Sequence, residues 1–374
     1  MLGFVTLLGA YAQGVDCDRP VPDAFSATSY VNPVLDEDFP DPSVLLMPDG
    51  VYYGYATQTV RDGRRVNIQV AASRDLVRWT PPSEAMPVKP TWASQAWNFW
   101  APHVVAADGH YIMYFSAQPD RTSTSVLGLG MCVGVASADK PQGPFLALPE
   151  PLVCGDGFVH IDPMAFDDPR SSKHYLYWGS GFAPLRVQEL ASDRTHFMPS
   201  SAPIDLISPM REVETYSRLV EGAWAVFRDG YYYLFYSGDD CCSQGGVAAH
   251  YAVMVARASS PTGPFVTLAE ATGRPDSVIL RAGKRWRAPG HNAVVRDAAG
   301  ADWLVYHAID ARRPYHYSSR DSIRSHHLST RRVMLLDHLR YQNGWPFVDA
   351  DSPSETERSS PCLTALKRWQ NIPP

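Results

Sequence analysis

The chain has 374 residues, of which 45% are hydrophobic and 19% are charged, and this is enough to bury a large core in one big domain or two ordinary ones. Its formal net charge is −6 and no run of Lys and Arg marks a phosphate-binding face, so nucleic acid is excluded as an expected partner. Beyond the N-terminus no stretch approaches about eighteen apolar residues, which excludes a predicted membrane span.

The first twelve residues, MLGFVTLLGAYA, are apolar and end in the small-x-small pattern Ala10-Tyr11-Ala12. They resemble a secretory signal, truncated because it is short and lacks a basic n-region. We therefore expect a secreted, extracellular protein in which residues 13–31 form an N-terminal extension. Six cysteines are compatible with disulfide bonds in that setting, and their pairing stays open, a Cys17–Cys362 bond being one candidate: Cys17, Cys132, Cys154, Cys241, Cys242 and Cys362.

An Asp-Gly turn followed by an aromatic strand recurs along the chain. Clear copies are PDGVYYGYAT (48–57), ADGHYIMYFSA (107–117) and RDGYYYLFYSG (228–238), and degenerate copies are SSKHYLYWGS (171–180) and GADWLVYHA (300–308). Asp-Gly is a hairpin signal, and the aromatic and β-branched runs beside it predict strands. The chain therefore contains five similar units.

Each hairpin is flanked by further predicted strands. Short strands precede the turns at 41–47, 100–107, 162–168, 221–229 and 290–298, and others follow at 67–79, 131–145, 185–197, 253–265 and 333–347. No helical periodicity is sustained, and 32 prolines with 26 glycines fit a turn-rich chain. We predict an all-β fold, a five-bladed β-propeller over 32–348, with a C-terminal extension over 349–374. A pair of β-sandwiches is the alternative, but it would not need such similar units.

Five residues stand at the heads of the strands that precede the turns. Counting back eight residues from each clear Asp-Gly gives Asp41, Trp100 and Glu221, and the degenerate copies give Asp162 and His291. The first strand of a propeller blade lines the central channel, so these side chains should converge at one mouth.

Three of these heads are carboxylic acids, and neighbouring carboxylates raise one another's pKa. Glycoside hydrolysis needs one carboxylic acid to protonate the leaving oxygen and one carboxylate to activate water or attack the sugar. A third carboxylate can keep the acid protonated near neutral pH. No phosphate loop, serine nucleophile elbow or zinc motif competes with this interpretation in the sequence.

At these residues the chain resembles glycoside hydrolase family 43, the five-bladed propeller enzymes that release arabinofuranosyl or xylosyl units from plant polysaccharides. The similar motifs are PDPSV, HIDPMAF and EGAWAVFRDGYYYLFYS. The resemblance implies that Asp41 is the general base, that Asp162 tunes the pKa of the acid and orients it, and that Glu221 is the general acid. It also implies inversion, with base and acid carboxyl groups about 6.5–9.5 Å apart.

Further roles follow from the resemblance. His291 matches a histidine that, in many members, lies near a hydrated calcium or sodium ion on the propeller axis, while the chemistry itself requires no cofactor. Trp100 matches an aromatic residue that borders the sugar subsite, although a core position is equally compatible. Arg331 or Arg332 would contact a sugar hydroxyl, and the choice between them stays open. Asp38 is not at a motif position, and we interpret it as a loop charge.

The expected function is that of a secreted, inverting, exo-acting α-L-arabinofuranosidase or arabinanase, working as a monomer on arabinan or arabinoxylan of the plant cell wall. A β-xylosidase would share the catalytic set, and a catalytically silent carbohydrate-binding propeller would lack an acid or base.

Two departures from the family pattern stand out. Ala223 follows Glu221-Gly222 where many members have proline, and residues 237–258 carry the adjacent cysteines Cys241 and Cys242, which either shape the pocket rim or brace a loop.

Overall fold

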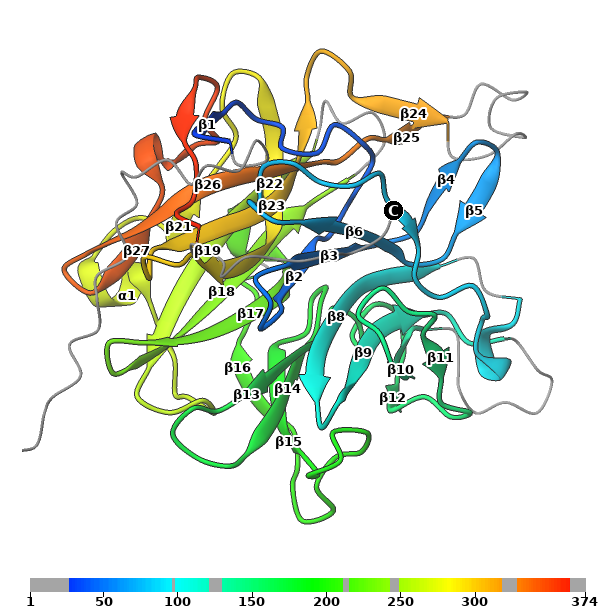
Figure 1. Ribbon diagram of the computed structural model, residues 1–374. Helices are drawn as coiled ribbons and strands as arrows, with labels where there is room; N and C mark the ends of the chain where they lie inside the picture. Colours follow the sequence, from blue (N-terminus) through cyan, green and yellow to red (C-terminus); the bar gives the residue numbers. More distant parts are fainter. Residues whose placement is uncertain are drawn as a thin grey trace, which may run out of the picture.

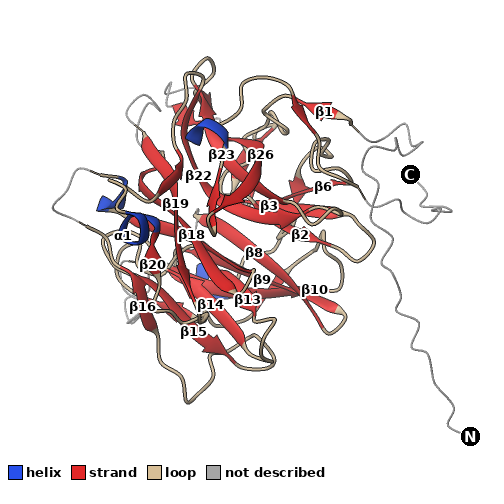
Figure 2. Ribbon diagram, turned by 90° about the vertical axis from the view of Figure 1, so that its left-hand side faces the viewer, coloured by secondary structure: helices blue, strands red, loops and turns tan. Residues whose placement is uncertain are grey.

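A computed structural model describes residues 27–95, 98–120, 130–210, 215–242, 249–317 and 328–363. The expected signal at 1–12, most of the expected N-terminal extension and Cys17 lie outside the described residues. Strands make up nearly all the regular structure, and the one described α-helix is the short α1 (Leu268–Thr272) (Figure 2). No helix within the described ranges is long and apolar enough to cross a membrane.

Each repeated unit folds into one antiparallel sheet, and the five sheets surround a common centre as the blades of a β-propeller (Figure 1). The first blade contains β2 (Ser43–Leu46), β3 (Tyr52–Ala56), β6 (Gln69–Ser73) and β7 (Ser83–Glu84). The second contains β8 (Phe99–Ala107), β9 (His110–Ala117), β10 (Cys132–Ala138), β11 (Leu146–Ala147) and β12 (Val153–Cys154). The third contains β13 (Met164–Asp167), β14 (His174–Trp178), β15 (Leu185–Leu190) and β16 (Ile204–Ile207).

The last two blades complete the ring. The fourth contains β17 (Val220–Arg228), β18 (Tyr231–Asp240), β19 (His250–Ala258), β20 (Val266–Thr267) and β21 (Val278–Leu280). The fifth contains β22 (Trp286–Arg296), β23 (Asp302–Asp310), β26 (Val333–Gln342) and β27 (Trp345–Phe347). The first strands of neighbouring blades contact one another, including β22 with β2, so the predicted five-bladed propeller is confirmed and its first strands line the centre.

Three small strand pairs lie outside the blades. They are β4 (Thr59–Arg61) with β5 (Arg64–Val66), β24 (Tyr315–Tyr317) with β25 (Leu328–Thr330), and β1 (Ser29–Tyr30) with β28 (Arg358–Ser359). The last pair joins the two ends of the described chain. Short 3₁₀ turns occur at Thr91–Ala93, Tyr216–Arg218 and Asp349–Asp351. The domain limits at 32 and 348 stay a prediction.

Tyrosines of the repeat tie each blade to the next. In the first four blades a tyrosine of the second strand donates its hydroxyl to a backbone carbonyl in the outer hairpin of the following blade: Tyr55 to Pro141, Tyr114 to Arg194, Tyr177 to Pro261 and Tyr233 to Gly344. Buried tyrosines fill the space between blades with their rings and need a partner for the hydroxyl. This arrangement explains why the repeated strands are rich in tyrosine.

Two disulfide bonds are present among the described residues. Cys132 pairs with Cys154 and thereby links β10 to β12 in the second blade. Cys241 pairs with its neighbour Cys242 directly after β18. The adjacent cysteines therefore form one bond with each other and do not tie separate segments together.

Candidate active site

The backbone at the head of every blade takes the same unusual conformation. Five residues have a φ of +46° to +62°, in the left-handed region, one in or just before the first strand of each blade: Asp41, Ala101, Asp162, Gly222 and His291. Such values are uncommon for residues other than glycine and occur where surrounding structure enforces them. The repeat therefore produces the same left-handed backbone conformation at five positions around the centre.

Trp100 and Glu221 precede this position by one residue, so the predicted equivalence of the five heads is wrong by one residue in the second and fourth blades. The hairpin of the first blade closes through residues 47–51, because Leu46 pairs with Tyr52. The second and fourth hairpins close through two-residue turns, at 108–109 and 229–230. Counting from the Asp-Gly turn therefore does not align the strands.

A side chain from the preceding blade accepts the backbone N–H of each head residue. In four of the five cases the acceptor is the last or last-but-one residue of the repeated aromatic segment: Thr57 for Ala101, Ser116 for Asp162, Ser237 for His291 and His307 for Asp41. In the fourth blade Asp162 itself accepts the N–H of Gly222. The corresponding hydroxyl there belongs to Ser180, which donates to Glu221 instead. The sequence interpretation missed this ring of polar residues, although their shared place in the repeat is visible.

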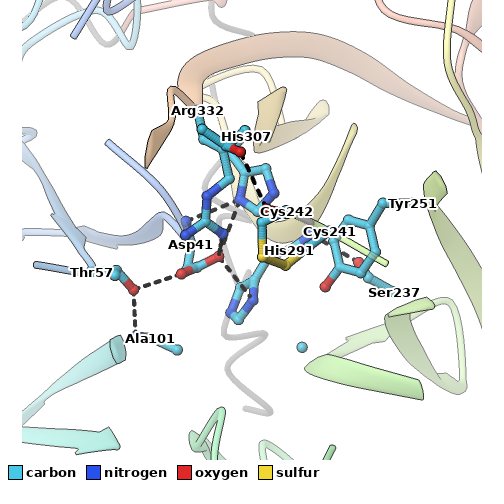
Figure 3. Close-up of polar contacts among 12 residues, drawn as sticks. Asp41, Thr57, Ala101, Ser237, Cys241, Cys242, Tyr251, His291, His307 and Arg332 are labelled. Atoms are coloured by element: carbon cyan, nitrogen blue, oxygen red, sulfur yellow. Dashed lines mark hydrogen bonds and ion pairs between the residues drawn. A yellow bond between two sulfur atoms is a disulfide. The ribbon is translucent and has the colours of Figure 1, made fainter. Parts of the chain in front are cut away.

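Asp41 lies in a cationic environment (Figure 3). Its Oδ1 pairs with the Arg332 guanidinium at 2.7 Å, and its Oδ2 accepts the Thr57 hydroxyl at 2.6 Å. Only 8% of Asp41 is exposed. Burial is the largest single influence and acts to raise the pKa of this carboxyl, but the charge of Arg332, together with the other groups beside the carboxylate, holds the pKa well below its usual range. Asp41 is therefore ionised and suited to act as a base.

Asp162 and Glu221 face the opposite situation. Burial and the neighbouring charges of Glu221 and Asp41 raise the pKa of Asp162 well above its usual range. Burial also raises the pKa of Glu221, although hydrogen bonds from Ser180 (2.6 Å) and Tyr251 (2.7 Å) to its carboxylate oxygens act in the other direction. The two acids interact and titrate as a pair. Together they retain a proton at a pH where Asp41 has none.

Two histidines stand beside Asp41. Burial lowers the pKa of both, that of His307 to about 4, so both rings are neutral at neutral pH. The Nδ1 of His307 accepts the backbone N–H of Asp41, which places the ring proton on Nε2. That tautomer cannot also donate to the Asp41 carboxylate, so we assign the low pKa of Asp41 to Arg332. His291 Nδ1 lies 3.5 Å from Asp41 Oδ1 and 3.9 Å from Asp162 Oδ2.

Two hollows open beside the three central carboxyl groups. The larger, of about 410 Å³, is lined by Asp38, Thr57, Trp100, His316 and Arg332, among others, and therefore lies on the Asp41 side. The smaller, of about 310 Å³, is lined by Arg218, Leu219, Glu221, Asp239, Asp240 and Cys241. Both fall within the size range of ligand sites.

The surroundings of the hollow on the Asp41 side decide three questions that the sequence left open or answered differently: the place of Trp100, the choice between two arginines, and the place of Asp38. Trp100 is partly exposed within it and tilts against Phe158, so it borders the hollow and is not a core residue. Of the two arginines, Arg332 reaches the centre, whereas Arg331 bonds to Asp36. Asp38, which we interpreted as a loop charge, is part of the wall.

An ion on the propeller axis would have to be held by the residues around a small channel. This channel is about 10 Å³ in volume, is lined by Asp162, His291 and Asn292, among others, and has room for about one water. The side-chain amide of Asn292 has no hydrogen-bond partner there. Calcium needs six to eight oxygen ligands, many of them waters, and no group of three or more His, Cys, Asp and Glu residues in the described part of the chain is arranged to bind a metal. The channel thus does not fit a hydrated cation, and the ion near His291 stays a prediction.

Comparison with known proteins shows which family and which relatives this chain is similar to. Residues 30–346 match Glycosyl hydrolases family 43. The chain is 26% identical over 299 residues to the extracellular exo-alpha-(1->5)-L-arabinofuranosidase ArbA of Cellvibrio japonicus (strain Ueda107), covering 75% of this chain and 80% of that protein. It is 25% identical over 292 residues to the extracellular endo-alpha-(1->5)-L-arabinanase 1 of Bacillus subtilis (strain 168), covering 75% and 79%.

Solved structures agree in architecture. The structure of Cellvibrio cellulosa alpha-L-arabinanase complexed with arabinohexaose aligns with a TM-score of 0.65 at 22% identity, over 84% of this chain and 96% of that chain. At this identity the likeness supports the fold alone. The family match, by contrast, spans most of the sequence, including all three central acids. The chain therefore belongs to family 43 of the glycosyl hydrolases.

Proposed function

We propose that the protein is an inverting glycosidase that releases α-L-arabinofuranosyl units from arabinan or arabinoxylan of the plant cell wall. The observation that carries this proposal is the opposite shift of carboxyl pKa values at one site, low for Asp41 and raised for Asp162 and Glu221. Carboxyl groups whose environments separate their pKa values are suited to acid and base roles. The names of the two curated relatives support arabinan as substrate and a site of action outside the cell.

In the proposed reaction, Glu221 donates its proton to the glycosidic oxygen of the leaving group. Asp41 removes a proton from a water molecule, whose oxygen attacks the anomeric carbon from the opposite face. The bond to the leaving oxygen breaks as the bond to the water oxygen forms, so the anomeric configuration inverts. Asp41 ends protonated and Glu221 ionised, and exchange with solvent restores both.

The residues around the acids fit these steps. Ser180 and Tyr251 donate hydrogen bonds to Glu221 and stabilise the carboxylate that forms when the proton leaves. Arg332 and Thr57 fix both oxygens of Asp41 and so orient its carboxylate. Asp162 lies next to the acid, accepts the N–H of Gly222 and thereby fixes the backbone beside Glu221.

Product analysis tests the proposal. The protein would be incubated with linear arabinan, arabinoxylan and xylo-oligosaccharides, and the products separated by chromatography while proton NMR follows the first anomer formed. Arabinose released with inversion is the expected result, and short arabino-oligosaccharides would indicate endo action at an open groove. Release of xylose alone would favour a β-xylosidase. Retention of configuration, or no product from folded protein, would overturn the proposal.

A further inference from the structure

The Cys241–Cys242 disulfide lies near Tyr251 (Figure 3). Cys241 lines the 310 Å³ hollow together with Glu221. It packs against a small buried cluster that includes Tyr251, and the hydroxyl of this tyrosine donates to Glu221. Cys241 therefore shares a hollow with Glu221 and packs against the cluster that contains a hydrogen-bond partner of this acid.

Hydrogen bonds hold the cysteine pair between β18 of the fourth blade and the β24–β25 strand pair. The N–H of Cys242 donates to Asp240 at 3.1 Å, and the carbonyl of Cys242 accepts the hydroxyl of Thr330 at 3.2 Å. Thr330 lines the hollow on the Asp41 side. The disulfide thus stands at the rim between the two hollows, with Cys242 exposed and Cys241 partly buried.

The proposed reaction indicates which part of the substrate contacts the rim formed by the disulfide. Glu221 lines the smaller hollow, whereas Thr57 and Arg332, the partners of Asp41, line the larger one. A general acid protonates the leaving oxygen, and the base activates water on the opposite face of the sugar. The group released with that oxygen therefore enters the hollow that contains Cys241.

The walls of this hollow differ in polarity. On one side Arg218 pairs with Asp239 at 2.6 Å, and His250 bonds to the other oxygen of Asp239 at 2.7 Å. On another side lies Cys241, whose sulfur is polarisable and forms only weak hydrogen bonds. A sugar ring has a matching pair of surfaces, because its hydroxyl edge is polar and its C–H face is apolar.

We propose that the Cys241–Cys242 disulfide is an apolar wall for the C–H face of the sugar that carries the leaving oxygen, and that it makes the enzyme select a sugar as leaving group. The Arg218–Asp239 pair receives the hydroxyl edge of the same ring. This inference rests on the proposed function, since it assigns the acid role to Glu221.

The test compares two substrates that share the released pentose and differ in the leaving group: the disaccharide of that pentose and its glycosyl fluoride, whose leaving group has no ring. The variant is C241A/C242A, and the matched control is C132A/C154A, which removes the disulfide of the second blade. For the vicinal variant, the ratio of kcat/KM on the disaccharide to kcat/KM on the fluoride should fall about tenfold or more, as expected when apolar contact with a substrate is lost. The control should keep the wild-type ratio.

A second measurement avoids any failure of the variant to fold. The wild type is treated with dithiothreitol under native conditions, mass spectrometry counts the thiols formed, and the ratio is measured before reduction, after it, and after reoxidation. The proposal is supported if the ratio of the two kcat/KM values falls when the Cys241–Cys242 bond is reduced and returns to its first value after reoxidation. An unchanged ratio in both experiments would overturn it, whereas no turnover of either substrate by the wild type would instead refute the proposed function.

Discussion

Asp41 and Asp162 occupy equivalent places in the first and third blades. Both have a positive φ, of 55° and 59°, both are under 10% exposed, and both are followed by proline. Their environments nevertheless differ, because Asp41 faces the Arg332 guanidinium and Asp162 faces the carboxyl of Glu221. The comparison teaches that the repeat fixes where a carboxyl stands, while a residue from another blade decides whether it is charged.

The largest expected effect comes from removing the acid on the Asp162 side. Glu221→Gln should lower kcat/KM on natural glycosides about 10²–10⁴-fold, the usual contribution of general acid catalysis. Activity on glycosides with strongly acidic leaving groups should be retained, because these need little protonation. Kinetics on both substrate types provide the measurement. An equal loss on both would show that Glu221 is not the acid, and circular dichroism controls for folding.

The same isosteric change should have opposite effects on stability at the two equivalent aspartates. Asp41→Asn leaves the partly buried Arg332 without its charge partner and should cost about 1–3 kcal/mol of unfolding free energy at pH 7. Asp162→Asn removes a carboxyl whose charged form is disfavoured by burial and by the neighbouring acids. It should raise the unfolding free energy by about 0.5–2 kcal/mol, while activity falls. Denaturant unfolding of both variants measures the contrast.

The pH dependence of stability tests the cause of this contrast. The folded state holds the Asp162 proton to a higher pH than the unfolded chain, so this carboxyl lowers stability as pH rises above its ordinary pKa of 3.8. The advantage of Asp162→Asn should therefore grow from about pH 4 upward. For Asp41, whose folded pKa is depressed, the stabilising contribution is present above pH 3.8 and is lost as pH falls through the folded value. Parallel changes in the two variants would contradict the assignment of the two environments.

The smallest expected effect concerns the tuning of the acid. Tyr251→Phe removes one hydrogen bond to the Glu221 carboxylate, worth roughly 1.5–3 kcal/mol to the charged form. The pKa of Glu221 should rise, and the alkaline limb of the pH profile of kcat/KM should move to higher pH while the acidic limb stays in place. Tyr233→Phe is the matched control, since that hydroxyl bonds to Gly344 in the outer part of the next blade. A shift of both limbs, or of neither, would contradict the role of Tyr251.

The sequence predicted the fold and the three acids because both are repeated local patterns. Asp-Gly turns and aromatic strands are visible at short range, and the acids precede them at nearly constant spacing. The repeat did not reveal that Arg332, and not Arg331, reaches Asp41. Arg332 and Asp41 are 291 residues apart in the sequence, and they meet only when the ring closes. Ser180 and Tyr251 were missed for another reason, because their contacts with Glu221 run between neighbouring blades and across one blade, and no local pattern marks them. The one-residue offset of Trp100 and Glu221 came from hairpin loops of different length.

The hydrogen bond between the Asp41 N–H and His307 has a consequence for folding. The two residues are 266 positions apart and belong to the first and last blades, so this contact forms only when the chain has travelled around the entire ring. Contacts of such long sequence separation form slowly, since loop-closure entropy must be overcome first. The same closure brings Arg332 to Asp41 and so completes the environment that keeps Asp41 ionised. A nascent chain that has folded only four blades would therefore lack the ionised carboxylate to which we assign the role of base.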